Sequence, residues 1–160
     1  MEKRMRHSSI EFGENTVTKT AAPDLMRIEV AKTRKAFEIG KACGLFRVPK
    51  VLEYDEAQGL AVFERFDVKP VSRAVRWGKK RCALAKTLGT SLAIIHRELT
   101  LSPDMRVPLP REFAFPHGEV ILHGDLSVDN VCVGDVGAPI AILDWQMTSV
   151  CGGRATYGTR

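Results

Sequence analysis

Two short motifs, at positions 121–130 and 142–145, constrain the fold of this chain more than any other feature. They place Asp125 and Asn130 on one loop, and they place Asp144 at the end of an apolar run. The intervening segments 131–133 and 140–143 are typical of a β-hairpin, which can return Asp144 to the edge where Asp125 lies. Two carboxylates and a carboxamide in this order can align a hydroxyl and hold a divalent metal on phosphates.

Size and charge narrow the possibilities. A chain of 160 residues is long enough for one modest domain or two small lobes. The formal net charge is +5, with basic clusters at positions 3–6 and 79–81. Because no aromatic residues are interleaved with these clusters, a solvated surface explains them better than a nucleic-acid site, and we expect no nucleic-acid partner. A mild excess of positive charge also suits an anionic ligand such as ATP.

The sequence carries no sign of a membrane protein or a disulfide framework. It contains no run of about 18 apolar residues, so no transmembrane helix is expected. The first residues, Met-Glu-Lys-Arg, lack the apolar core of a signal peptide. The four cysteines show no paired short spacing, which favours reduced thiols over disulfides or zinc ligands. We therefore expect a cytoplasmic protein.

The first part of the chain predicts a small sheet with one helix. Residues 9–20 alternate around Gly13 as in a β-hairpin. A helix is predicted over 25–42, after Pro23 and before Gly44. Strands are predicted over the two segments that follow a proline or a turn, 48–54 and 60–66. Residues 67–70 resemble a connector, so we place the boundary between two lobes there, giving lobes 1–66 and 67–160.

The second part is predicted to contain one long helix before the two motifs. A helix is predicted over 81–99 because leucine and isoleucine recur there at spacings of three and four. The proline-rich segment 102–116 is expected to be irregular, and 120–122 is expected to be a short strand. Trp145 is expected in the core. Residues 151–160 are polar and contain glycine, with no pattern that indicates a core element.

The motif His-Gly-Asp-Leu-Ser-Val-Asp-Asn at 123–130, with Leu-Asp-Trp at 143–145, resembles the catalytic loop and metal motif of the aminoglycoside phosphotransferase and choline kinase family. The resemblance implies a bilobal, protein-kinase-like α+β fold with a small antiparallel-sheet lobe and a mainly helical large lobe. It implies transfer of a phosphoryl group from ATP, with Mg²⁺, to a hydroxyl of a small molecule. By position, Asp125 resembles the catalytic base, Asn130 and Asp144 the metal ligands, and His123 the structural histidine that opens the loop.

The remainder of the chain follows the same family order. Lys19 resembles the lysine that contacts the α- and β-phosphates, and Glu29 resembles its partner on the next helix. Segment 61–66 resembles the hinge strand, where the backbone around Glu64 and Phe66 would meet adenine. Gly13 is the only glycine of the turn expected to cover the phosphates. Ser127 stands where many members of the family have histidine.

Two alternatives stay open beside the kinase interpretation. Family members usually continue with several helices beyond the position that matches Asp144, so the chain resembles a lobe that is shortened at its C-terminus. Such a chain can also be a module without turnover that binds a nucleotide or a partner. A metal-dependent phosphoesterase is favoured less, because His117 and His123 near Asp125 are too few ligands for two metals.

Overall fold

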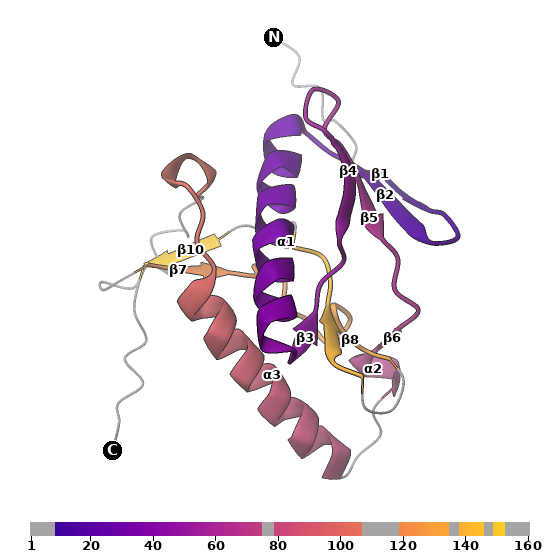
Figure 1. Ribbon diagram of the computed structural model, residues 1–160, viewed down its shortest axis with the longest axis vertical. Coiled ribbons are helices and arrows are strands. Elements are labelled where there is room, and N and C mark those ends of the chain that lie inside the picture. The colour runs from indigo at the N-terminus through magenta and orange to yellow at the C-terminus, as the bar shows by residue number, and fades with distance from the viewer. Residues whose placement is uncertain (1–8, 75–78, 107–118, 135–137, 146–148, 153–160) are drawn as a thin grey trace.

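The computed structural model describes five stretches of the chain, residues 9–74, 79–106, 119–134, 138–145 and 149–152. They form a mixed α+β fold, as predicted, with three sheets and two long helices. Figure 1 shows helix α1 beside the N-terminal sheet, while helix α3 lies toward the other end of the molecule. None of the helices in the described part is long and apolar enough to cross a membrane.

The N-terminal sheet is antiparallel, with strand order β1-β2-β5-β4. Its strands are β1 (Ser9–Phe12), β2 (Thr16–Thr20), β4 (Val51–Asp55) and β5 (Leu60–Glu64). The predicted hairpin is confirmed by the pairing of β1 with β2. The strand predicted over 48–54 begins only at Val51. The side chain of Val48 is buried in the core, and Pro49 has no N–H to donate to a neighbouring strand.

Helix α1 (Pro23–Cys43) confirms the predicted helix, beginning two residues before the predicted start at 25 and ending one residue after the predicted end at 42. Pro23 occupies the first turn, where its missing N–H costs nothing. Gly44 ends the helix in the left-handed conformation, with φ of 69°, and its N–H donates to the carbonyl of Gly40. The helix contributes to two cores: its first half packs under the N-terminal sheet through Met26 and Val30, and its second half packs with α3.

The second sheet joins residues from both sides of the predicted lobe boundary at 66/67. Its order is β3-β9-β8-β6, formed by β3 (Phe46–Arg47), β9 (Ile140–Ile142), β8 (Val131–Val133) and β6 (Lys69–Pro70). The hairpin predicted between the two motifs is confirmed by the antiparallel pairing of β8 with β9. Strand β3 pairs with β9 in parallel. The boundary itself stays a prediction, but contacts within this sheet and the core around Phe46 cross it.

The other elements surround the larger core. They are α2 (Val71–Ala74), α3 (Lys79–Glu98), the 3-10 turn Pro103–Met105, β7 (Glu119–Leu122) and β10 (Ser149–Gly152). Of the predicted apolar stripe, Ile95 and Leu99 are buried. Trp145 is 1% exposed, which confirms its place in the core. Strand β10 pairs with β7, so residues 151 and 152 belong to a strand although no core pattern was found over 151–160. Most of the segment expected to be irregular lies outside the described residues.

Candidate active site

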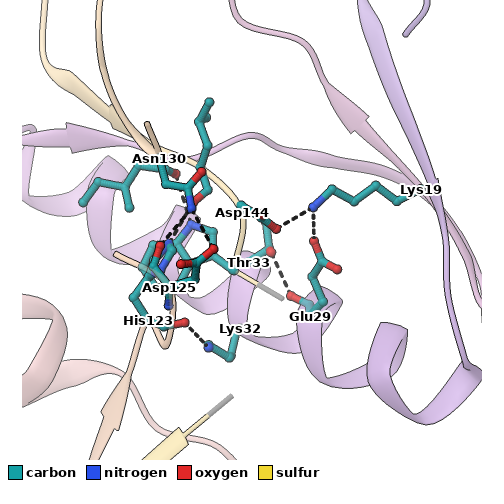
Figure 2. A network of polar contacts seen from close by, with 11 residues as sticks. Lys19, Glu29, Lys32, Thr33, His123, Asp125, Asn130 and Asp144 are labelled. Atoms are coloured by element: carbon teal, nitrogen blue, oxygen red, sulfur yellow. Dashed lines mark hydrogen bonds and ion pairs between the residues drawn. The ribbon is translucent and has the colours of Figure 1, made fainter. Parts of the chain in front are cut away.

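Lys19 on β2 lies between two carboxylates. Its Nζ is 2.7 Å from Oε1 of Glu29 on α1 and 2.8 Å from Oδ1 of Asp144, which follows β9 (Figure 2). Glu29 is 2% exposed, whereas the side chain of Asp144 is 35% exposed. The structure therefore brings the predicted phosphate lysine, its predicted helix partner and one predicted metal ligand to one place.

Asp144 is held in an uncommon backbone conformation. Its φ is 58°, and among the described residues it is the non-glycine residue with a positive φ. Aspartate tolerates this region better than most residues do, but the conformation still has to be imposed by its surroundings. The N–H of Leu143 donates to the carbonyl of Asn130 at 2.9 Å, and the ring of Trp145 is buried beside it. These contacts aim the Asp144 carboxylate at Lys19.

Asn130 joins the second part of the site to Asp125. Its Nδ2 donates to the backbone carbonyl of Asp125 at 2.8 Å and to the Asp125 Oδ2 at 3.1 Å. Asp125 is exposed, so its carboxylate can meet a molecule arriving from solvent. Because Nδ2 is used in this way, the Oδ1 of Asn130 is the atom that is left to bind a cation.

His123 ties the Asp125 loop to the segment that carries Asp144. Its Nε2 lies 2.8 Å from the carbonyl oxygen of Leu143, and its Nδ1 accepts from the N–H of Asp125 at 3.3 Å. Because a carbonyl oxygen can only accept, Nε2 carries the proton, and because Nδ1 accepts, the ring is neutral. The ring also packs on Trp145, with centroids 4.6 Å apart. These contacts hold the start of the Asp125 loop against the segment that carries Asp144.

A cleft of about 380 Å³ lies beside these residues. Lys19, Glu29, Asn130 and Asp144 line it, together with the predicted hinge residues Glu64 and Phe66. Asp125 is not among its lining residues and reaches it through Asn130. Much of the remaining wall is apolar, formed by the side chains of Ile10, Phe12, Val17, Phe63, Val68 and Leu143.

The turn at Gly13, which the family resemblance places over the phosphates, is bonded to Arg65. Its carbonyl accepts from the Nη1 of Arg65 at 2.6 Å, and the N–H of Arg65 donates to the carbonyl of Asn15 at 3.0 Å. The turn is therefore fastened to the residues that follow β5. Lys19 pairs with Ala61, near the opposite end of β5. That this turn covers the phosphates stays a prediction, and the structure places the turn at the end of β5 that lies away from Lys19.

Burial and charge set the protonation of the site. Burial alone would lower the pKa of the Lys19 ammonium, but the negative charge of Glu29 and the hydrogen bond to Asp144 outweigh it, and the pKa is raised. Lys19 is therefore a cation at neutral pH. Burial lowers the pKa of His123 to about 4, which keeps the ring neutral.

Two buried polar residues of α1 were not singled out from the sequence. Lys32 is 0% exposed, and its Nζ donates to the backbone carbonyl of His123 at 2.9 Å. Thr33 lines the cleft and donates to the carbonyl of Glu29 at 2.7 Å. A signal was available, because positions 29, 32 and 33 follow the helical spacing of three and four that marks one face. Charged residues on a buried face are uncommon enough to indicate a role.

Comparison with solved structures identifies the fold. No protein-family model matches the chain, and the search of curated protein sequences found no match. A choline/ethanolamine kinase family protein from Mesorhizobium loti matches over 90% of this chain and 56% of its own, with a TM-score of 0.57 and 17% identity. The GDP and kanamycin complex of APH(2")-IIia matches over 92% and 69%, with a TM-score of 0.61 and 11% identity.

The choline kinase LicA from Streptococcus pneumoniae adds a third match, over 94% of this chain and 63% of its own, with a TM-score of 0.53 and 12% identity. The chain thus spans little more than half the length of the Mesorhizobium loti protein and less than two thirds of LicA. At these identities the likeness concerns the fold alone. The chain has the kinase-like α+β fold of the choline kinase and aminoglycoside phosphotransferase structures, over the part of that fold that it spans.

Proposed function

We propose that this chain carries the catalytic site of a phosphotransferase that uses ATP and Mg²⁺ to phosphorylate a hydroxyl of a small molecule. The observation that carries the proposal is the position of Lys19, which lies 2.8 Å from Asp144 and is held by the buried Glu29. Asn130 lines the same cleft and bonds to Asp125. A cation for phosphates, oxygen ligands for a metal and an exposed carboxylate therefore lie together, which is what phosphoryl transfer needs.

The cleft suits a nucleotide. Its volume of about 380 Å³ falls in the range of small-molecule sites. Its apolar wall, with Val17 and Phe63 among the lining residues, offers a surface for a flat base, and the hinge residues Glu64 and Phe66 line the same cleft. Lys19 lies on the strand beside this wall, where its ammonium would contact the phosphates. The base would then lie toward the hinge and the phosphates toward Asp144.

Asn130 and Asp144 fit a magnesium site. Both present hard oxygen atoms, and Mg²⁺ in nucleotide sites is held by one or two protein oxygens together with phosphate oxygens and water. When bound, the ion would supply charge neutralisation on the phosphates. Asp144 would exchange its contact with Lys19 for this role, since the phosphates offer the lysine an alternative anion. Within the described ranges no three His, Cys, Asp or Glu side chains gather as a metal site, so this pair needs the ligand's own oxygens.

The reaction needs little from the protein beyond alignment. The acceptor oxygen forms a bond to the γ-phosphorus as the bond to the β,γ-bridging oxygen breaks, and ADP leaves. The Asp125 carboxylate accepts the proton of the acceptor hydroxyl, and Asn130 holds that carboxylate in place. Lys19 offsets the negative charge on the phosphates.

The compartment that we propose is the cytoplasm, where thiols stay reduced. Cys43, Cys82 and Cys132 are free thiols in the structure.

A transfer assay tests the proposal. Purified protein is incubated with γ-labelled ATP, Mg²⁺ and a panel of alcohols that includes aminoglycosides, choline and sugars, and labelled product is separated. We expect transfer to at least one acceptor, loss of transfer in Asp125→Asn, and unchanged nucleotide affinity in that variant. Normal turnover in Asp125→Asn would overturn the assigned role. Nucleotide binding without turnover on any acceptor would instead support a module that binds a nucleotide without catalysis.

A further inference from the structure

Helix α1 reaches the site at two points, and only one of them belongs to the proposed phosphate machinery. Glu29 holds Lys19, whereas Lys32, three residues later on α1, reaches to the loop that carries Asp125 (Figure 2). The contact is made to the backbone carbonyl of His123, 91 residues away in sequence, at 2.9 Å. One rigid helix is therefore bonded both to the lysine that would hold phosphates and to the loop that would align the acceptor.

The contacts close into a ring. Lys32 bonds to the backbone of His123, and the ring of His123 bonds to Leu143. Asp144 follows Leu143 and bonds to Lys19, and Lys19 bonds to Glu29, which lies one helical turn before Lys32. Because the ring closes through α1, moving the helix shifts the phosphate lysine, the metal carboxylate and the acceptor loop together.

The burial of Lys32 is hard to explain by packing alone. An ammonium group taken out of water loses its hydration, so a buried lysine weakens a core that an apolar side chain would fill. Neighbouring core positions on α1, Met26 and Val30, are apolar. Lys32 is nevertheless 0% exposed, and burial lowers its pKa to about 8, with the charge of Glu29 acting in the opposite direction. The position therefore keeps a costly group whose Nζ meets a backbone oxygen next to the catalytic loop.

We propose that Lys32 is a positioning residue, which fixes the His123 carbonyl from α1 and thereby sets the Asp125 loop relative to Lys19. An effect of Lys32 on the reaction rate rests on the proposed phosphotransferase function. The bond between Lys32 and the loop does not depend on that function. The backbone of Asp125 is held on both sides: its N–H donates to Nδ1 of His123, and its carbonyl accepts from Nδ2 of Asn130. Lys32 supplies the contact that ties this loop to the helix.

The main test compares Lys32→Met, which keeps the length and loses the donors, with Lys32→Arg, which keeps a charged donor. Lys35→Met on the exposed side of the same helix is the matched control. Hydrogen exchange without nucleotide should speed up at least tenfold for the amides of residues 123–126 in Lys32→Met and much less in Lys32→Arg. Equal exchange in Lys32→Met and Lys35→Met would overturn the proposal whether or not the protein is a kinase.

Kinetics then test the effect on catalysis. If wild type transfers phosphate, kcat of Lys32→Met should fall about 10- to 100-fold, as expected for a misplaced catalytic group, with KM for ATP changed less than threefold. Lys32→Arg should recover part of this loss. A raised KM with unchanged kcat would overturn the positioning role. Absence of turnover in wild type would count against the proposed function and leave the exchange result to decide on Lys32.

A measurement on the unaltered chain covers the case in which Lys32→Met does not fold. In protein labelled with ¹⁵N and ¹³C, Nζ of Lys32 should give a correlation to the carbonyl carbon of His123 through their hydrogen bond. Its ammonium protons should exchange slowly with water, in contrast to those of Lys35. A rapidly exchanging Lys32 ammonium without this correlation would overturn the proposal.

Discussion

The Nζ of Lys19 and the Oδ1 of Asp144 lie 2.8 Å apart although 125 residues of sequence separate them. This contact joins the N-terminal sheet to the segment after β9. Neither residue reaches the other by local structure: Lys19 is placed by its pairing with Ala61, and Asp144 by the β8–β9 hairpin. The ion pair therefore forms only when the two parts of the site are correctly assembled. The first two predictions concern its two residues.

Removal of the Lys19 charge should destabilise the fold through Glu29. Lys19→Met leaves the Glu29 carboxylate, which is 2% exposed, without its cation. We expect a loss of about 3 kcal/mol in unfolding free energy, the usual size for breaking a buried pair from one side. The double variant Lys19→Met/Glu29→Gln should lose less unfolding free energy than the sum of the losses in the two single variants. Urea unfolding of the four proteins measures this, and strict additivity would show that the two side chains do not interact.

Asp144 should be required for magnesium-dependent nucleotide binding. In Asp144→Asn we expect the affinity for ATP with Mg²⁺ to fall about tenfold or more, a size typical of weakened metal sites, while the affinity without Mg²⁺ changes little. Titration calorimetry with and without the metal measures both. Asp55→Asn serves as a control, because that carboxylate accepts from Gln58 in the β4–β5 turn. An unchanged dependence on Mg²⁺ in Asp144→Asn would count against its assignment as a ligand.

Local signals in the sequence predicted much of this arrangement. Pro23 and Gly44 gave the limits of α1, because each acts on the backbone at its own position. The short motif around Asp125 and Asn130 predicted a tight loop, and the two side chains do lie within 3.1 Å. In each case the residues that determine the structure are close neighbours in the chain.

Contacts between distant segments could not be predicted in the same way. Strand β10 forms by pairing with β7. Strand β3 has only two residues and depends on its pairing with β9. Such strands have no pattern of their own, since their partner supplies the hydrogen bonds. Lys32 was missed for a related reason: a lysine on a helix is normally solvated, and only the position of the His123 carbonyl shows what its burial achieves.

Two glycines with similar backbone angles should respond differently to alanine. Gly44 has φ of 69°, and an added Cβ would have nothing within 4 Å, so Gly44→Ala should cost only the left-handed conformation, about 1 kcal/mol. Gly59 has φ of 62°, and its Cβ would lie 2.2 Å from the carbonyl oxygen of Ala21. We therefore expect Gly59→Ala to cost at least twice as much in urea unfolding. Equal losses would mean that the Ala21–Gly59 contact gives way easily.

Stability should fall as the pH drops through the range set by His123. The pKa of this ring is lowered to about 4 in the folded chain, from 6.5. Above 6.5 the ring is neutral in both states and the stability is full, whereas between 6.5 and 4 the unfolded chain takes up a proton that the folded chain refuses.

The loss of unfolding free energy across that range should reach about 3 kcal/mol, since each pKa unit is worth about 1.4 kcal/mol. His123→Gln removes the titration while keeping a donor and an acceptor. The difference in stability between wild type and this variant, followed by urea unfolding from pH 7 to pH 4, should therefore shrink with falling pH. His96, whose pKa burial also lowers, is present in both proteins and cancels. A difference that stays constant would show that burial does not keep the His123 ring neutral in the folded chain.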